Sequence, residues 1–354
     1  MKRLQAFILT GLIFWVSISW SGMERNTLAV GEQPQIAADP GGMIRIVFGS
    51  EDKIFCSTSE DQGTRFSKPV LVAEIPGMHL GMSRGPQLAS SANFSMITAI
   101  DKSGNIHCFL LNHRLKGWKN IGTINDLKGS GPEGLMGLTA DQQDHFYAVW
   151  LDTRNGNKNQ VYFSSFSAGA AHWSKNTLVY QSPDGHVCEC CQPGISVLGS
   201  EIAILFRNWL NGSRDLYLVR SSDGGRTFTG GQKLGMGTWK LNGCPMDGGG
   251  VYVDGSGAVH TVWQREGSVY YCRPGEPEIQ IGKGRSCSIT GTAGHAVISM
   301  QTGDSLKLFI LPHKKEIAVG SGSFLKSIVL PDGKIYAVWE QDKKIQIAKK
   351  QSDE

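Results

Sequence analysis

The sequence carries little net charge and no concentrated run of basic residues. Its 354 residues give a formal net charge of +4, and no stretch interleaves lysine or arginine with aromatic residues. Because nucleic-acid binding depends on clustered positive charge that neutralises phosphates, the composition argues against a nucleic-acid partner. A long helical pattern of apolar residues is also missing, so a predominantly helical fold is not expected.

Long hydrophobic runs are confined to the N-terminus. Lys2 and Arg3 precede an apolar stretch over residues 6–20, which ends in the small residues around Trp20. This order is typical of a secretory signal peptide over residues 1–21, followed by one domain over residues 22–354. An uncleaved membrane anchor is the alternative, and the lack of a following cysteine argues against a lipoprotein. We expect a secreted or periplasmic protein with no membrane span after cleavage, in a compartment that permits disulfides.

Glycine is abundant, with 45 residues, and one glycine-containing turn stands out. Residues 221–228 read Ser-Ser-Asp-Gly-Gly-Arg-Thr-Phe and follow an alternating strand pattern. Ser221 and Asp223 can accept hydrogen bonds from nearby backbone N–H groups. Gly225 can adopt a positive φ where the chain reverses, and Phe228 can fold back over the turn. The run therefore predicts a hairpin turn between two strands.

Two weaker copies of this turn occur elsewhere. Residues 59–66 read Ser-Glu-Asp-Gln-Gly-Thr-Arg-Phe after a strand-like run, and a third version over residues 165–173 has Ser167 in place of the aspartate. The chain also divides into units of roughly 40–55 residues, the period expected of propeller blades. Each unit contains three short apolar strands and a weak fourth one. We therefore predict an all-β fold, a β-propeller with hairpins of this kind.

Seven such units fit the sequence, and six is the alternative because the last two are short. The seventh unit stops before a fourth strand, which residues 27–30 could supply to close the ring, since an open ring leaves an unpaired sheet edge. The first strands are expected to begin near Pro34, Pro86, Met136, Pro193, Pro245, Cys287 and Phe324. The second strands are expected to include residues 44–48, 96–100, 146–150, 202–206, 259–263, 296–300 and 335–339.

Propeller geometry assigns the loops to two faces. Loops between second and third strands, and the links between blades, share the face opposite the turns described above, and we expect a functional site there. Arginines gather in these segments, and arginine forks suit carboxylate or phosphate ligands. The expected ligand is thus an anionic small molecule or a glycan, although solvated loop residues are the alternative. The candidate ligand-binding residues are Arg84, Arg154, Arg207, Arg214 and Asp215.

Cysteines gather in the links on the same face. Cys188, Cys190 and Cys191 lie in one link and Cys244 in the next. In a secreted protein the main expectation is a disulfide from Cys190 or Cys191 to Cys244, without a cofactor. The alternative is a copper or zinc site formed by these four thiolates, which would make a metal-binding or redox-linked protein. Helper ligands for that site would be His79, Met82 or His186.

Other cysteines and tryptophans fall within predicted strands and have simpler interpretations. Cys56, Cys108 and Cys272 lie in third strands and are expected to be buried free thiols. The tryptophans that end second strands are expected to pack between blades. They are Trp150, Trp263 and Trp339.

The turns and the repeats resemble those of the sialidase-like superfamily, the Asp-box or BNR-repeat β-propellers. The resemblance covers nearly all of the chain after the signal. More narrowly, the run Cys188-x-Cys190-Cys191, followed by Arg207 and then Cys244-Pro245, is similar to a group of secreted bacterial sialidase-like proteins. The resemblance implies a propeller fold and raises exo-sialidase-type glycosidase activity as a hypothesis.

The catalytic residues of exo-sialidases are only partly matched. Arg84-Gly85-Pro86 is similar to their Arg-Ile-Pro motif, with Gly85 as the departure. Catalysis would be a retaining displacement with a tyrosine as nucleophile. The resemblance nominates Asp101 or Asp152 as acid/base, and Tyr270 or Tyr271 with Glu266 as the nucleophile pair. A glycosidase, a glycan-binding protein, a metal or redox protein and a scaffold without a small ligand all stay open.

Overall fold

A computed structural model describes residues 23–350 except 116, 171 and 293, and in this part of the chain the regular structure consists of strands. The signal peptide expected over residues 1–21 lies outside the described residues. Within the described part, no helix is long and apolar enough to cross a membrane.

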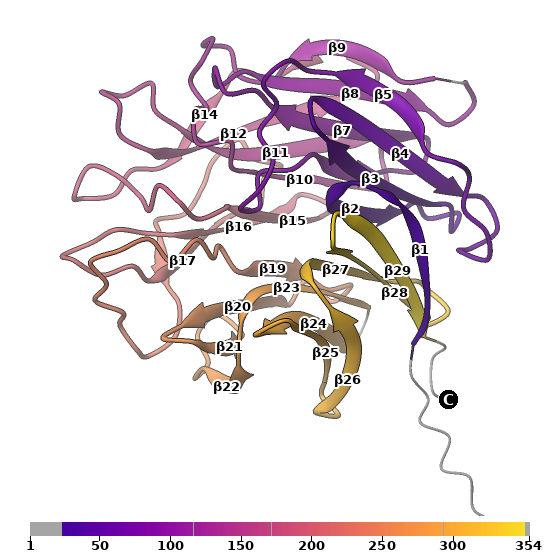
Figure 1. Cartoon of the computed structure of the whole chain (residues 1–354). Helices are drawn as coiled ribbons and strands as arrows, with labels where there is room; N and C mark the ends of the chain where they lie inside the picture. Colours follow the sequence, from indigo (N-terminus) through magenta and orange to yellow (C-terminus); the bar gives the residue numbers. More distant parts are fainter. Residues whose placement is uncertain (1–22, 116, 171, 293, 351–354) are drawn as a thin grey trace, which may run out of the picture.

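Seven antiparallel sheets follow one another round a ring in chain order (Figure 1). Each innermost strand contacts the innermost strands of both neighbouring sheets, and the last of them contacts the first. The seven-bladed β-propeller predicted from the repeats is therefore confirmed, and the six-bladed alternative is wrong. Each unit of the repeat supplies one blade because a single sheet cannot bury both of its apolar faces alone.

The first four complete blades are built from consecutive strands. They comprise β2 (Glu32–Ala38), β3 (Ile44–Ser50), β4 (Lys53–Ser59) and β5 (Val70–Glu74); β6 (Gln87–Ser90), β7 (Phe94–Ile100), β8 (Ile106–Asn112) and β9 (Lys119–Thr123); β10 (Met136–Ala140), β11 (His145–Asp152), β12 (Gln160–Ser167), β13 (His172–Trp173) and β14 (Thr177–Tyr180); and β15 (Gly194–Leu198), β16 (Glu201–Arg207), β17 (Leu216–Ser221) and β18 (Gln232–Lys233).

The remaining blades complete the ring. They comprise β19 (Gly250–Val253), β20 (Val259–Arg265), β21 (Ser268–Cys272) and β22 (Ile279–Lys283); β23 (Arg285–Thr292), β24 (His295–Thr302), β25 (Ser305–Leu311) and β26 (Lys315–Ser321); and β27 (Ser323–Val329), β28 (Ile335–Gln341), β29 (Lys344–Lys350) and β1 (Glu24–Val30).

The ring closes by pairing the two ends of the chain in one blade. β1 runs antiparallel to β29, from Glu24 opposite Lys349 to Val30 opposite Lys344. The prediction that residues 27–30 supply the missing fourth strand is confirmed. The pairing covers the outer edge of β29, which would otherwise expose unpaired backbone groups.

One first strand begins later than the sequence suggested. β19 begins at Gly250 rather than near Pro245, because the residues between them form an irregular segment. In that segment Met246 and Gly249 have left-handed backbone, with φ of 48° and 75°. The Asp247 carboxylate fixes the segment by accepting a hydrogen bond from the Ser286 backbone nitrogen at 2.6 Å. Proline was a poor marker here because the innermost strand starts only after this turn.

The packing between blades follows the predictions. Trp150, Trp263 and Trp339 are all buried at the ends of second strands. Their size fills the layer between sheets, where removal of a large side chain leaves a costly cavity. The three cysteines expected in third strands, Cys56, Cys108 and Cys272, are likewise buried and free.

The turn over residues 221–228 has the hydrogen bonds that its residue types predicted. The Ser221 hydroxyl accepts the Gly225 backbone N–H at 2.9 Å, and an Asp223 carboxylate oxygen accepts the Thr227 N–H at 2.9 Å. Gly225 has a φ of 87°, which only glycine adopts readily. Phe228 packs edge-on against the neighbouring blade, so the turn also ties two blades together.

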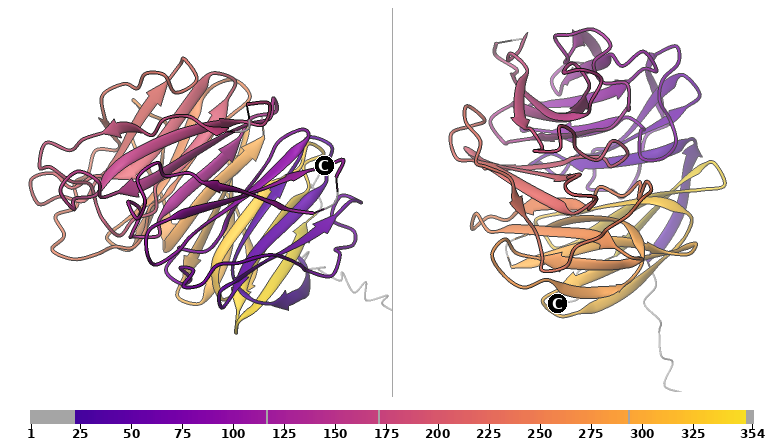
Figure 2. Two further views of the ribbon diagram at one scale, coloured as in Figure 1. Left: turned by 90° about the horizontal axis from the view of Figure 1, so that it is seen from above. Right: turned by 90° about the vertical axis from the view of Figure 1, so that its left-hand side faces the viewer.

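The same pattern recurs at residues 59–66, where Gly63 has a φ of 80° and its N–H donates to the Ser59 hydroxyl at 2.8 Å. Strand alternation places these turns at one end of the blades and the links at the other. The turned views show the loops gathered at the two ends of the sheets (Figure 2). Below, the end that carries the links between blades is called the link face.

Candidate functional site

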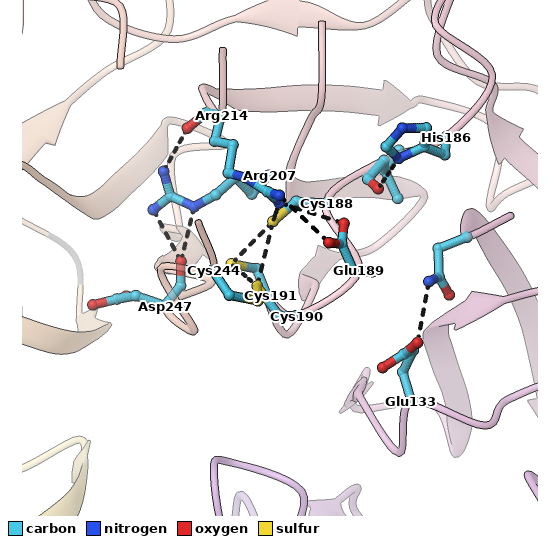
Figure 3. The surroundings of a disulfide bond; sticks show 12 residues. Glu133, His186, Cys188, Glu189, Cys190, Cys191, Arg207, Arg214, Cys244 and Asp247 are labelled. Carbon is cyan, nitrogen blue, oxygen red and sulfur yellow. Dashed lines mark hydrogen bonds and ion pairs between the residues drawn. A yellow bond between two sulfur atoms is a disulfide. The ribbon is translucent and has the colours of Figure 1, made fainter. Parts of the chain in front are cut away.

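Four of the eight cysteines meet on the link face, from two neighbouring links. Cys190 forms a disulfide with Cys244, which confirms one of the two predicted pairings. Cys188 and Cys191 are buried free thiols next to this bond. The three sulfur atoms of Cys188, Cys190 and Cys191 lie 3.5–3.9 Å from one another (Figure 3).

A glycine lets the two links approach each other this closely. A Cβ at Gly248 would lie 1.8 Å from the Gln192 carbonyl oxygen, so any other residue would push the links apart. The first link is also anchored to β16, because the Cys188 backbone nitrogen donates to the Arg207 carbonyl oxygen at 3.0 Å. The sulfur atoms are therefore held by the ends of two blades rather than by a free loop.

Arg214 supplies positive charge to the sulfur atoms. Its Nη1 atom donates to Cys188 Sγ at 2.9 Å, and its guanidinium forms an ion pair with Glu189 at 3.4 Å. The same guanidinium lies over the Trp209 ring, 4.6 Å from the ring centroid. With three such partners and little exposure, Arg214 is held in position beside Cys188 rather than extended into solvent.

The two free thiols differ in acidity. A hydrogen bond with Cys191, followed by the attraction of the Arg214 charge, lowers the pKa of Cys188 to about 7. Burial raises the pKa of Cys191, and its hydrogen bond with Cys188 acts in the same direction, although the Arg207 charge opposes them. Cys188 is therefore the more readily ionised sulfur of the pair.

The Arg207 guanidinium donates its hydrogen bonds to nearby backbone carbonyl oxygens. Its Nε and Nη2 atoms donate to the Asp247 carbonyl oxygen at 3.0 and 2.9 Å, and Nη2 also donates to the Gln264 carbonyl oxygen at 2.9 Å. Its Nη1 atom donates to the Arg214 carbonyl oxygen at 2.7 Å. The side chain is 1% exposed. This geometry gives Arg207 a structural role.

Near the axis, two adjoining pockets open on the link face. They share Ser83, Phe324 and Lys326, and together they are called the axial basin here. The basin reaches the sulfur cluster, because Cys190 lines one pocket, and it reaches the first blade, because Gln33 lines the other. The innermost strands β2 and β27, from the first and last blades, thus both line this basin. They meet there only because the ring is closed.

The lining of the axial basin has an unusual backbone. Six non-glycine residues in it have positive φ, a conformation that costs of order 1 kcal/mol or more per residue. Strained backbone of this kind concentrates at ligand-binding sites. The residues are Gln33, Met82, Ser83, Met246, Ser286 and Phe324, with φ between 48° and 63°.

Two polar side chains in the basin have few partners within the protein. Among the described residues, the buried Gln33 amide has no hydrogen-bond partner at either its nitrogen or its oxygen. Lys326 lies in the same pocket, and burial lowers its pKa, while the nearby Cys287 and Asp247 act in the opposite direction. Buried amides are normally hydrogen-bonded, so an orphaned one in a pocket points to a missing ligand or water.

The other predicted ligand residues lie on the link face but are paired to different degrees. Arg154 donates to Asp152 at 2.9 Å and to Asp126 at 2.7 Å, and its guanidinium lies over the Tyr162 ring. Arg84 makes a single hydrogen bond, from Nε to the Glu133 carbonyl oxygen at 2.6 Å. Arg84 is therefore the predicted arginine with the most donors left for a ligand.

The Asp215 carboxylate is held by contacts within the protein. Its carboxylate accepts the Trp239 backbone N–H at 2.8 Å and lies 3.4 Å from the Lys233 ammonium group. The carboxylate is therefore engaged in holding the segment before the second cysteine link.

The residues nominated for glycosidase catalysis are not brought together. Asp152 is 0% exposed, and its carboxylate accepts hydrogen bonds from Ser130, Trp150 and Arg154. Glu266 is exposed in the turn between β20 and β21, on the link face.

Tyr271 lies toward the opposite end of β21, where its hydroxyl contacts His260 Nδ1 at 2.7 Å. Glu266 lies in the turn before β21 begins at Ser268, whereas Tyr271 is the fourth residue of that strand. Tyr270 on the adjacent position packs against Trp263 and the Arg265 guanidinium. Asp101 accepts hydrogen bonds from Asn105 and contacts His107. Each of these side chains thus has contacts other than the glutamate–tyrosine contact that the resemblance implied.

Sequence reasoning missed the axial basin itself. Gln33, Phe324 and Lys326 carried no motif, and the left-handed backbone that marks them is invisible in residue types. The available signal was positional, because each lies at the start of a predicted innermost strand. That position alone places a residue near the axis of a propeller.

No protein-family model and no curated protein sequence matches this chain. Solved structures are similar in fold. The BP39L lectin from Burkholderia pseudomallei aligns with a TM-score of 0.70 at 9% identity, covering 92% of this chain and 97% of that one. An α-L-arabinanase from Penicillium chrysogenum, solved with arabinobiose, gives 0.55 at 11% identity over 92% and 97%. A PL25 ulvan lyase gives 0.58 at 9% identity over 91% and 94%. At such identities these likenesses show the fold alone.

Proposed function

We propose that this protein is an extracytoplasmic carbohydrate-binding β-propeller whose ligand occupies the axial basin. The observation that carries the proposal is the buried amide of Gln33, a residue that lines the basin and whose amide has no partner among the described residues. A sugar hydroxyl both donates and accepts, so it can satisfy the two ends of this amide at once. The lectins and glycan-active enzymes among the structural neighbours support this class of ligand.

The two pockets measure only about 40 and 10 Å³, so a sugar ring would lie across the mouth of the basin and contact its lining from there. Phe324 supplies an apolar surface for the C–H face of a ring, and Lys326 and Asp247 supply charged hydrogen-bonding groups. Lys326 favours an acidic sugar, because a carboxylate would offset the cost of keeping the ammonium group charged in a partly enclosed site. Arg84, which follows Met82 and Ser83 of the basin, adds a second positive charge on the same link. The proposed ligand is therefore an anionic glycan.

Glycan-array binding with the purified protein tests this proposal. We expect binding to glycans that carry a uronic or sialic acid, and at least about tenfold weaker binding by Lys326→Gln, since a charge-assisted hydrogen bond contributes about 1.5–3 kcal/mol. Lys119→Gln, on the exposed outer strand β9, is the matched control and should bind like the wild type. Failure to bind any glycan, or equal binding by Lys326→Gln, would contradict the proposal.

Glycosidase activity of the exo-sialidase type is the enzymatic form of the same proposal. It needs an acid, and a tyrosine with a nearby glutamate, at one site. Asp152 is buried, and Glu266 and Tyr271 lie toward opposite ends of β21, so the proposed role is binding without turnover. Hydrolysis of a fluorogenic sialoside by the wild type would overturn this choice, provided that Arg84→Ala abolishes it.

A further inference from the structure

The sulfur atoms of Cys188, Cys190 and Cys191 form a nearly equilateral triangle. The distances are 3.5 Å between Cys188 and Cys191, 3.7 Å between Cys188 and Cys190, and 3.9 Å between Cys190 and Cys191. Thiolates bound at about 2.3 Å to one tetrahedral ion lie about 3.8 Å apart, and in a trigonal arrangement about 4.0 Å apart. The triangle therefore has the dimensions of a metal–thiolate site.

The surroundings can hold the charge of such a site. Three thiolates around a monovalent or divalent ion leave a net negative charge, which buried surroundings disfavour unless cations are near. Arg214, which is 7% exposed, donates to Cys188 Sγ at 2.9 Å. Figure 3 shows the Arg214 guanidinium directed at Cys188, while the Arg207 guanidinium is hydrogen-bonded to the Asp247 and Arg214 carbonyl oxygens. Outer-shell cations and fixed backbone are the supports that metal sites require.

We propose that Cys188, Cys190 and Cys191 bind one thiophilic d10 metal ion, Cu(I) or Zn(II), when the Cys190–Cys244 disulfide is reduced. Thiolate ligands select soft ions of this kind over magnesium or calcium. The disulfide and the metal are alternative partners of Cys190. A dithiol reductant gives two electrons and two protons to the S–S bond, becomes a disulfide itself, and leaves Cys190 and Cys244 as thiols. Metal binding then releases the thiol protons.

An ion can reach this site from the axial basin. Cys190 lines the basin, as do Met82 and Met246, which are 56% and 41% exposed. Thioether sulfur is a soft, weak donor, so exposed methionines at the entrance suit transient contact with the same class of ion. The proposed metal site differs from the proposed carbohydrate site, and it would stand if no glycan bound.

The test is an anaerobic titration of the purified protein, after reduction and removal of the dithiol. Cu(I) is supplied in competition with a chromophoric Cu(I) chelator, and Zn(II) in competition with a colorimetric zinc indicator. We expect one equivalent of one of these ions to bind to the reduced protein. The protein with its disulfide intact should bind that ion at least about tenfold more weakly, because one of three ligands is blocked. Equal binding by the two forms, or no stoichiometric binding by the reduced form, would overturn the proposal.

Variants assign the ligands. Cys188→Ser and Cys191→Ser should each lower the affinity by more than about a hundredfold, beyond the 10–100-fold typical for loss of an outer-shell partner. Cys108→Ser is the matched control, because this buried free thiol lies in β8, outside both the triangle and the basin. The control should bind like the wild type. Wild-type affinity in both ligand variants would refute the assignment, and the comparison of oxidised and reduced wild type needs no variant to fold.

Discussion

Replacement of Arg207 by methionine separates a structural arginine from a ligand-binding one. The side chain is 1% exposed, and its donors reach the backbone carbonyl oxygens of Asp247, Gln264 and Arg214 at 2.7–3.0 Å. Methionine has a similar length and no donor. Arg207→Met therefore keeps most of the packing and removes the hydrogen bonds that join the ends of two neighbouring blades.

The expected loss of stability follows from these contacts. Three buried carbonyl oxygens lose a donor, and each unsatisfied buried group costs about 1–3 kcal/mol. Together the three groups would cost about 3–9 kcal/mol. The variant also avoids burying a charge, which brings the expected net loss to the low end of that range, about 3–5 kcal/mol. With an unfolding entropy of about 2.1 cal/mol/K per residue over roughly 330 residues, the Tm should fall by about 4–7 °C.

Thermal unfolding followed by circular dichroism measures this shift. Arg220→Met is the matched control, because Arg220 is 43% exposed and its pair with Glu201 spans 3.6 Å. Such exposed pairs contribute little, so the control should melt within about 1 °C of the wild type. An Arg207→Met protein that melts like the wild type but fails to bind an anionic glycan would show that Arg207 is a ligand residue after all.

Three further perturbations test the fold. Gly225→Ala should destabilise the ring by about 1–3 kcal/mol, because φ is 87° and the new Cβ would lie 2.6 Å from an aromatic ring. Gly255→Ala, with open space around it, should melt like the wild type. Hydrogen bonds from Thr227 lower the pKa of Asp223, so its contribution to stability is present above about pH 4 and lost as the pH falls further. Asp223→Asn should therefore flatten the dependence of Tm on pH below about pH 4, and unchanged slopes would contradict that cause. Truncation of β1 should expose the edge of β29 and produce aggregates in light scattering, whereas Thr27→Ala, which removes one exposed side-chain hydrogen bond, should stay monodisperse like the wild type.

The fold could be predicted because its signals are local. The second strand of the first blade is a short, mostly apolar run bounded by turn residues, and β3 (Ile44–Ser50) lies where that run put it, with residues 44–49 all buried. The closing strand followed from a physical need, since a ring with an unpaired edge is unstable. The predicted start of β19 was wrong because the irregular segment before it is fixed by a hydrogen bond between Asp247 and Ser286. That partner lies far along the chain.

For the candidate site, the sequence could predict only the face of the propeller on which these residues lie. The sequence placed the arginines and cysteines on the correct loops, and Cys190 and Cys244 do pair. It could not show which partners each arginine would take. Arg154 donates a hydrogen bond to Asp126 of the preceding link. Arg207 donates to backbone carbonyl oxygens that lie 40 and 57 positions away in the sequence. Side-chain partners across a ring depend on how blades pack, which residue types do not encode.

The central claim is that ring closure creates a ligand site at the axis of the link face. A crystal structure of the protein with the tightest-binding glycan from the array tests it most directly. The account predicts ligand density over Phe324, with hydrogen bonds to the Gln33 amide and to Lys326. Density confined to the outer rim, between blades and away from these three residues, would contradict it.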